Sequence, residues 1–149
     1  MTRKDFLKNA CNACLSVTLT GTLISSCTPT QYISGKIQKD GITILKTDFV
    51  IHKGKNQGYN SFIIVRNETL LYPICVHRIS DADYAAVWMR CTHQGTELQV
   101  SGDMLQCAAH GSEFNKRGIV TNGPAGSNLR SFPVKVNGNE IFIDLRKLS

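Results

Sequence analysis

Short β-favouring runs, separated by Gly, Asn, Asp and Pro, make up the chain from Ile42 to its end. No run carries apolar residues at the 3.6-residue spacing of a long amphipathic helix. The residues between the runs are those that hairpin turns require. The pattern predicts an all-β domain over residues 42–149, a small antiparallel sandwich or open barrel. The runs are ITILKTDFVI, SFIIVRN, LYPICVHRI, YAAVWMRC, ELQVSGDMLQC, GIVTNGP and FPVKVNGNEIFIDL.

Two predicted turns contain glycine. In VKVNGNEIFI, Asn137 and Gly138 can take the positive φ that a tight hairpin turn needs. In QVSGDMLQC, Gly102 and Asp103 stand at the turn of a second hairpin. This second turn should bring the residues on either side of it together.

The N-terminal segment has a different character. A basic start, MTRKDFLKN, precedes an apolar run of about a dozen residues and then small residues before Cys27. This order is typical of an export signal over residues 1–26, and the apolar run is short for a bilayer span. The ending ISSC resembles a bacterial lipobox, which implies a lipid on Cys27 and a bilayer as partner. Residues 27–41 then form the lipidated Cys and a tether.

The start TRKDFLK also resembles the twin-arginine export signal, with Lys4 where the second Arg belongs. That pathway moves folded proteins, which suits a protein that receives a metal cofactor before export. The alternative is the general secretory route with a chance resemblance. Either route leads to a membrane-anchored lipoprotein facing the periplasm, in the inner or the outer membrane.

Composition limits the classes of partner. The chain has 149 residues, 42% of them hydrophobic and 19% charged, which suits one globular domain. The formal net charge of +6 comes from 17 basic and 11 acidic residues. The basic residues are scattered and form no aromatic-basic stripe, so we expect no nucleic-acid partner. No small-molecule substrate site is evident.

The cysteines do not pair off. Cys11 and Cys14 lie inside the export signal, and Cys27 is the lipid site, out of six cysteines in all. Three cysteines remain in the mature domain. Exported proteins usually pair their thiols, but three is an odd number. At least one thiol of the mature domain is therefore not a disulfide partner. The remaining three are Cys75, Cys91 and Cys107.

Two Cys and two His stand on glycine-containing loops. Cys91-x-His93 and Cys107-x-x-His110 each follow a β run, thirteen residues apart. Structural zinc uses such ligands, and so does a Rieske-type 2Fe–2S cluster, with both Cys on one iron and both His on the other. A Cys91–Cys107 disulfide with two unrelated His is the third possibility. The alternation of Cys and His argues against a finger-type zinc site.

The motifs CTHQG and CAAHGS resemble the two ligand motifs of Rieske proteins. HGSEFN resembles the family's next residues, and NGPAG, residues 122–126, resembles its Pro loop, with Gly123 and Pro124 beside the cluster. The resemblance is strongest over residues 87–136 and looser over 42–145. It implies a Rieske-type fold with two cluster-binding loops.

The resemblance also implies roles for the four ligands. Cys91 and Cys107 would hold the buried iron of one 2Fe–2S cluster, and His93 and His110 the outer iron. Electrons would pass through the His edges, so a redox partner protein should dock at these loops. Two neutral imidazoles in place of thiolates make such centres easier to reduce, at about −150 to +300 mV.

The chain departs from high-potential members of the family. Thr96 and Ala109 stand where those members have a second pair of Cys joined as a disulfide. Ser112 is in place to donate a hydrogen bond to the cluster, but Phe114 replaces a Tyr that would donate another. Hydrogen bonds to the cluster sulfurs raise the potential, so we expect an intermediate value. Asn115 replaces an Asp, with no consequence that we derive.

Other residues have structural interpretations. Cys75 and His77 point to one face of a strand; we expect a small core thiol and a simply polar His, the alternative being a second metal site. Trp88 and Met89 should pack under the cluster. His52 should lie on the surface. Tyr84 and Phe132 should lie in the core, and Lys116 and Arg117 in a solvated turn, with docking of an acidic partner as their alternative role.

The sequence therefore predicts a membrane-anchored Rieske electron carrier. A small Rieske subunit of an oxidoreductase, of molybdenum or quinol-oxidising type, is the enzyme-class alternative. A structural zinc module is the non-redox alternative. No mononuclear iron motif is present, so the chain is not expected to be a complete ring hydroxylase.

Overall fold

The structure, a computed structural model, describes residues 30–53 and 56–146. The predicted export signal and Cys27 lie outside these residues. The described part is almost entirely β, with one four-residue 3-10 helix, η1 (Lys46–Phe49). No helix within it has the length and apolar character needed to cross a membrane. The strands are β1 (Tyr32–Ser34), β2 (Ile37–Gln38), β3 (Gly41–Leu45), β4 (Val50–Lys53), β5 (Asn56–Tyr59), β6 (Phe62–Arg66), β7 (Ile74–Arg78), β8 (Tyr84–Trp88), β9 (Gln99–Ser101), β10 (Met104–Gln106), β11 (Glu113–Asn115), β12 (Val120–Asn122), β13 (Ser131–Phe132), β14 (Val134–Asn137) and β15 (Glu140–Asp144).

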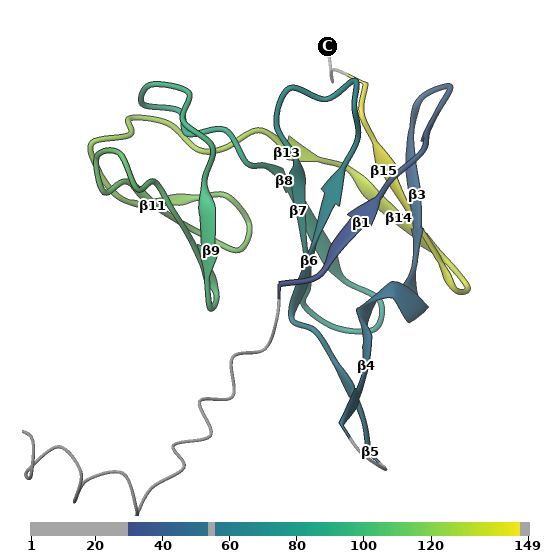
Figure 1. Ribbon diagram of the computed structural model, residues 1–149. Helices are drawn as coiled ribbons and strands as arrows, with labels where there is room; N and C mark the ends of the chain where they lie inside the picture. The colour runs from purple at the N-terminus through teal and green to yellow at the C-terminus, as the bar shows by residue number, and fades with distance from the viewer. Residues whose placement is uncertain (1–29, 54–55, 147–149) are drawn as a thin grey trace, which may run out of the picture.

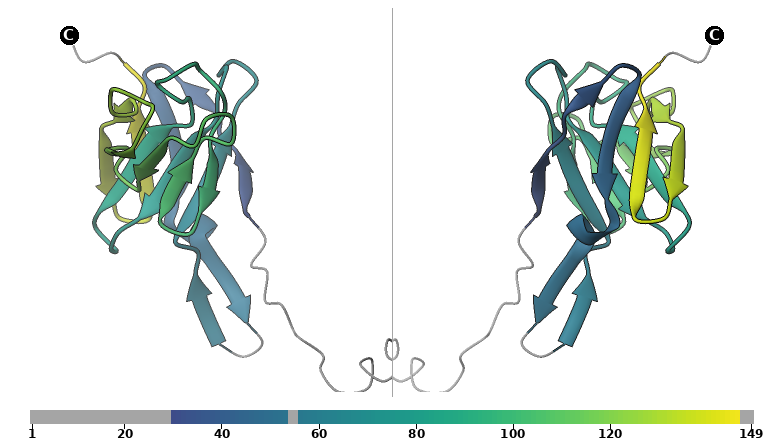
Figure 2. Two further views of the ribbon diagram at one scale, coloured as in Figure 1. Left: turned by 90° about the vertical axis from the view of Figure 1, so that its left-hand side faces the viewer. Right: turned by 90° about the vertical axis from the view of Figure 1, so that its right-hand side faces the viewer.

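Three sheets form three layers. The central sheet has the order β1-β6-β7-β8-β13, and a sheet of order β14-β15-β3-β2 packs on one face of it. A smaller sheet of order β12-β11-β10-β9 covers the other face. Figure 1 shows the small sheet set apart from the other two, and Figure 2 shows the outer layers from either side. The hairpin of β4 and β5 projects from the far end. The prediction of an all-β sandwich is confirmed.

The central sheet is buried on both faces, because another sheet packs on each of them. Successive side chains of a strand point to opposite faces, so both sets of side chains are buried. This is why β6, β7 and β8 read as continuous apolar runs rather than alternating ones. One set of their side chains enters the core against β3 and β15, and the other enters the core beneath the small sheet. The first set is Ile63, Val65, Ile74, Val76, Tyr84 and Ala86, and the second is Ile64, Cys75 and Val87.

The folded domain begins before Ile42, where the sequence analysis placed its start. Strand β1 pairs in parallel with β6, with Tyr32 opposite Ile64, and the amide of Gly35 donates to the carbonyl of Arg66 at 3.0 Å. Strand β2 pairs with β3. Residues 32–41 therefore belong to the sheets rather than to a tether.

The run ITILKTDFVI is also not one strand. The turn η1 interrupts it after Leu45, whose amide donates to the carboxylate of Asp48 at 2.7 Å. This side-chain acceptor satisfies a backbone donor where the strand ladder ends. The chain then leaves the sheet and forms the separate β4–β5 hairpin.

The two predicted hairpins exist, with one difference in register. Ser101 pairs with Met104 around Gly102 and Asp103, as predicted, and the φ of Gly102 is 59°. In the last hairpin Asn137 itself pairs with Glu140, so the two-residue loop is Gly138–Asn139. Only the glycine there has positive φ, 58°, as in a type II′ turn.

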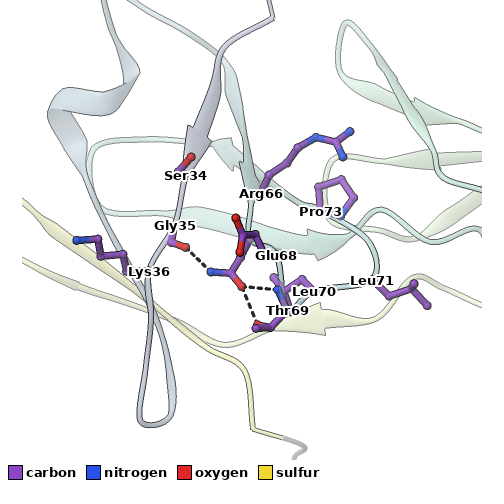
Figure 3. A pocket seen from close by; sticks show the side chains of 10 residues that line it. Ser34, Gly35, Lys36, Arg66, Glu68, Thr69, Leu70, Leu71 and Pro73 are labelled. Carbon is purple, nitrogen blue, oxygen red and sulfur yellow. Dashed lines mark hydrogen bonds between the residues drawn. The ribbon is translucent and has the colours of Figure 1, made fainter.

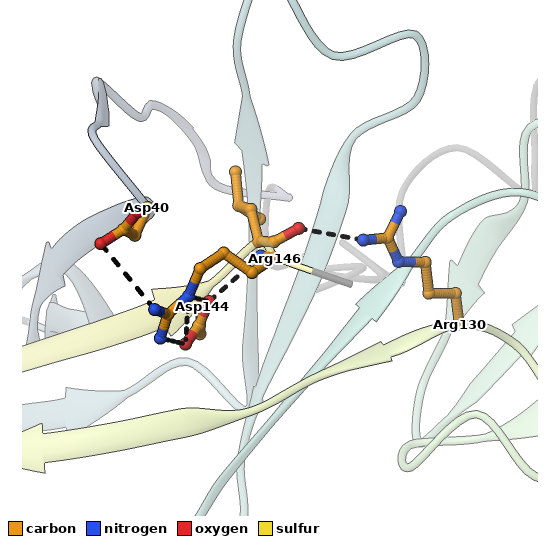
Figure 4. A network of polar contacts seen from close by, with 5 residues as sticks. Asp40, Arg130, Asp144 and Arg146 are labelled. Atoms are coloured by element: carbon orange, nitrogen blue, oxygen red, sulfur yellow. Dashed lines mark hydrogen bonds and ion pairs between the residues drawn. The ribbon is translucent and has the colours of Figure 1, made fainter. Parts of the chain in front are cut away.

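An ionic network ties the last described residues to the sheet (Figure 4). The guanidinium of Arg146 bonds the carboxylate of Asp144 and lies 4.0 Å from that of Asp40. Hydrogen bonds from Arg146 lower the pKa of Asp144 to about 2. Arg130 donates to the carbonyl of Leu145 at 3.0 Å. These contacts join the C-terminal strand to the chain that returns from the small sheet.

Candidate metal centre

The small sheet is an insertion between two neighbouring strands. Strands β8 and β13 pair in the central sheet, with Val87 opposite Ser131, and residues 90–130 leave and return between them. The amide of Trp88 donates to the carbonyl of Arg130 at 2.9 Å, which closes this neck. We call residues 90–130 the cluster module. Both candidate loops lie within it.

The two candidate loops have the same backbone construction. In the first, the amide of Cys91 donates to the carbonyl of Thr96 at 2.9 Å, and the amide of Gly95 donates to the carbonyl of Cys91 at 2.9 Å. The loop of residues 107–112 repeats both bonds at 2.8 and 2.9 Å. Gly95 and Gly111 occupy the same place in each loop, with φ of 78° and 77°. Because side chains rarely adopt this conformation, each motif requires its glycine.

These loops bring the four predicted residues together. Cys91 and Cys107 are 1% and 2% exposed, whereas His93 and His110 are exposed. The two imidazole rings lie edge to face, with centroids 4.9 Å apart. The two loops lie side by side, as the predicted turn at Gly102 and Asp103 led us to expect. The two cysteines lie on their inner side and the two imidazoles on their outer side.

Local hydrogen bonds favour the thiolate of Cys107. Burial on its own would raise its pKa, but the backbone N–H groups of Ala109 and His110 and the side chains of Cys91 and Thr96 lower it below the ordinary value. The thiolate is the form of cysteine that binds metal. The loop backbone thus prepares this sulfur as a ligand.

A third loop, the predicted Pro loop, is bonded to both candidate loops. The amide of Ala125 donates to the hydroxyl oxygen of the fully buried Ser112 at 3.0 Å. The hydroxyl of Thr92 donates to the carbonyl of Ser127 at 2.6 Å. The cis peptide bond Gly123–Pro124 directly precedes Ala125. Since Ser112 accepts from the Pro loop, its own proton remains available to another acceptor.

The packing beneath the loops agrees with the sequence in part. Met89 and Phe114 lie with the two candidate cysteines in the core beneath the small sheet. Trp88 instead packs against the core on the opposite face of the central sheet and against Tyr72, with ring centroids 5.4 Å apart. The indole of Trp88 donates to the carbonyl of Tyr72 at 3.1 Å, and the hydroxyl of Tyr72 donates to the carbonyl of Gly95. Sequence analysis missed Tyr72, which supports the first loop from a different part of the chain.

The third Cys-x-His motif is buried in the central sheet. Cys75 and His77 are 0% and 1% exposed, and the sulfur lies 3.4 Å from Nε2 of the imidazole. Burial raises the pKa of Cys75 and lowers that of His77 to about 4. Cys75 is a core thiol, as predicted. His77 is fully enclosed rather than simply polar, and its Nδ1 has no hydrogen-bond partner among the residues that the structure describes. His52 is exposed, as predicted.

The donor set fits a cluster of two irons. In the described part of the chain the three cysteines are free, and no three His, Cys, Asp or Glu side chains converge on a single point. Two thiols on one side and two imidazoles on the other instead supply two ligands to each of two metals, the division that Rieske clusters use.

A hollow of about 650 Å³ lies outside the cluster module, between the β1–β2 link and the β6–β7 loop (Figure 3). Asn67 lines the hollow and joins its two sides, since its amide donates to the carbonyl of Gly35 at 2.7 Å and its oxygen accepts from Thr69. None of the candidate ligands lines this hollow.

The chain is similar to known proteins. The plasma membrane Rieske protein PetC3 of Synechocystis PCC 6803 is 28% identical, with a TM-score of 0.49 over 56% of this chain and 86% of that chain. The complex of reduced oxygenase and oxidized ferredoxin in carbazole 1,9a-dioxygenase contains a chain that is 26% identical, with a TM-score of 0.47 over 60% of this chain and 85% of that one. A family model described as Rieske [2Fe-2S] domain matches residues 28–133. The chain therefore belongs to the Rieske family, and its domain is an electron-transfer domain that holds one Rieske-type 2Fe–2S cluster.

Proposed function

We propose that this protein is a membrane-anchored electron carrier in which Cys91 and Cys107 hold the inner iron of the cluster and His93 and His110 hold the outer iron. The observation that carries the proposal is the division between two buried sulfurs and two exposed imidazoles on loops of one construction. A centre of this type supplies one electron at a time at about −150 to +300 mV. The exposed imidazoles offer the short path to a partner.

The residues around the ligands would set how readily an electron is accepted. Ser112 is buried with a proton left to donate, and Phe114 is buried without a hydroxyl. One donor in place of two supports a potential between those of quinol-oxidising proteins and low-potential ferredoxin-like members. Thr96 and Ala109 cannot form a disulfide between the loops, and the bonds from the Pro loop offer an alternative support.

The membrane anchor rests on the sequence. The basic start, the short apolar run and the ISSC ending support export and lipidation of Cys27, and a domain anchored in this way would face the periplasm. Two residues separate Thr30, the first described residue, from Cys27. Because β1 starts at Tyr32, the folded domain would stand close to the membrane rather than on a long tether.

Electron paramagnetic resonance tests the ligands. The domain after residue 27 is produced in the cytoplasm and reduced with dithionite. A rhombic spectrum of low average g is expected, and it should be lost in His93→Ala and in His110→Ala. The exposed His52→Ala is the matched control and should keep the spectrum. A cluster that persisted in both ligand variants, or a colourless protein with stoichiometric zinc, would refute the assignment.

Two further measurements test the anchor and the partner. Labelled palmitate should enter the full-length protein in a bacterial host and fail to enter Cys27→Ala. Purification from the native membrane separates a free carrier from a small subunit of an oxidoreductase. A large catalytic chain that copurifies in a fixed ratio would favour the subunit.

A further inference from the structure

Two arginines of the described chain differ from the other four. Arg66, Arg78, Arg117 and Arg146 each have a carboxylate within 4.0 Å. Arg90 and Arg130 have none among the residues that the structure describes. Arg130 donates to the carbonyl of Leu145, which leaves its charge uncompensated. An exposed cation without a carboxylate partner is free to attract an opposite charge on another molecule.

Both unpaired arginines stand at the neck of the cluster module. Arg90 directly precedes Cys91, and Arg130 stands four residues after the Pro loop, where the chain re-enters the central sheet. Their guanidinium carbons lie 5.9 and 5.8 Å from the centre of the Trp88 ring, and that of Arg130 also lies 4.7 Å from the centre of the Phe132 ring. Cation–π contact favours this arrangement and limits the motion of the two side chains. The pair is therefore a fixed patch of two positive charges.

The patch lies beside the first candidate loop. A β-carbon built on Gly95 would be 3.3 Å from the guanidinium of Arg90, so this side chain rests on the loop that carries His93. The two candidate loops and the Pro loop contain no charged residue. Arg90 and Arg130 thus supply the net charge nearest the start of the first loop and the end of the Pro loop.

The two cations of the turn after β11 are already paired with carboxylates. Lys116 and Arg117 lie in the turn after β11, as predicted. Lys116 lies 3.5 Å from Asp103 and Arg117 lies 2.5 Å from Asp83, so neither is a free cation. Glu97 is paired with Arg66. The carboxylate of Glu113 accepts a hydrogen bond from Gln106 at 3.0 Å, and no cation of the described residues is paired with it.

We propose that Arg90 and Arg130 form the docking patch for an acidic electron-transfer protein, which they hold against the His93 and His110 edge. The inference rests on the proposed function and adds the charge of the partner. It commits to a protein with carboxylates around its own redox site. Charges of this kind act mainly on the rate of encounter, and salt weakens their effect.

Two redox proteins of opposite surface charge serve as probes: an acidic plastocyanin and a basic cytochrome c. In each reaction one electron leaves the reduced 2Fe–2S protein and converts Cu(II) of plastocyanin to Cu(I) or haem Fe(III) of cytochrome c to Fe(II). Stopped-flow rates are measured at about 10 mM ionic strength, where the Debye length is about 30 Å, and again at about 150 mM. Spectra recorded before mixing establish that each variant carries its 2Fe–2S centre.

Three double variants separate charge from packing and from net charge. Arg90→Gln with Arg130→Gln removes the patch. Arg90→Lys with Arg130→Lys keeps the charge and changes the contact with Trp88. Lys39→Gln with Lys46→Gln removes two charges from the opposite outer sheet and η1, and is the matched control.

The glutamine pair should slow reduction of plastocyanin by at least about threefold at low salt and speed that of cytochrome c, with both effects shrinking at higher salt. The lysine pair and the control pair should stay near the parent. The inference is overturned if the control pair slows the reduction of plastocyanin as much as the glutamine pair does. It is also overturned if the lysine pair slows this reaction as much as the glutamine pair, because the loss would then come from changed packing and not from lost charge. A parent protein that carries no 2Fe–2S centre would overturn the proposed function as well.

Discussion

Lowering the pH from 7.5 to 4.5 should destabilise this protein through one buried imidazole, that of His77. The side chain lies between the central sheet and the cluster module, with the Phe62 ring centre 5.7 Å away and Ala85 opposite it on β8. Burial lowers its pKa from 6.5 to about 4; the charge of Asp103 opposes that shift, and the charge of Lys116 adds to it. The folded protein therefore holds His77 neutral where the unfolded chain would protonate it.

The magnitude follows from the two pKa values. Between pH 6.5 and about 4 the unfolded state binds more protons than the folded state, so the free energy of unfolding falls as the pH falls. At about 1.4 kcal/mol for each pH unit, the loss approaches roughly 3 kcal/mol, most of it reached by pH 4.5. A domain with about 5–15 kcal/mol of total stability would show such a loss clearly. The contribution is fully present above pH 6.5 and lost below pH 4.

Urea denaturation measures this loss when unfolding is followed by far-ultraviolet circular dichroism at pH 7.5, 6.5, 5.5 and 4.5. The proteins compared are the parent, His77→Leu and the exposed-site control His52→Leu. The difference between parent and variant at each pH isolates His77, because the ligand histidines contribute equally to both proteins. The difference should move by about 2–3 kcal/mol in favour of His77→Leu as the pH falls. A parallel pH dependence in parent and His77→Leu would refute the reasoning, and His77→Gln provides a second variant if leucine does not fit.

Three further predictions concern the cluster module. Phe114→Tyr should raise the reduction potential in a dye-mediated titration, because the new hydroxyl can donate to the cluster; an unchanged value with an intact spectrum would count against the intermediate potential. Thr92→Val, which loses the bond to Ser127, should lower the free energy of unfolding by about 1 kcal/mol and hasten loss of the visible spectrum, while Thr92→Ser should behave as the parent. Gly118→Ala should cost more than about 1 kcal/mol, because its φ is 80° and its new β-carbon would come within 3.0 Å of two core side chains; Gly126→Ala, with open space around it, is the control, and equal melting temperatures would contradict the argument.

The fold class could be predicted from the sequence because turn residues punctuate short β-favouring runs. The strand boundaries could not. Strand β1 is only three residues long and gains its place by pairing with β6, thirty positions away in the chain. The break at η1 depends on a local bond from Leu45 to Asp48, while the run ITILKTDFVI remains apolar enough to suggest one strand.

The candidate site was more accessible to sequence reasoning than its support. Cys91, His93, Cys107 and His110 stand in two motifs with fixed spacing, and glycine at the same place in both loops follows from backbone geometry. Tyr72 carries no such signal, because its bond to Gly95 joins segments that only the folded sheet brings together. His77 was misjudged for the same reason: a strand pattern does not reveal that two other sheets cover the two faces of the central sheet.

The pairing of β8 with β13 has a consequence for engineering. Residues 90–130 leave and re-enter the central sheet at one point, so a short turn could replace them without changing the path of any other strand. The same segment could be moved as one piece into another hairpin with a similar spacing. Its removal would strip the cover from Ile64, Cys75 and Val87, and the shortened protein would present an apolar sheet surface to solvent. Transplantation therefore requires a recipient with its own apolar sheet face, and the donor scaffold needs a polar resurfacing of β6, β7 and β8 to remain monomeric.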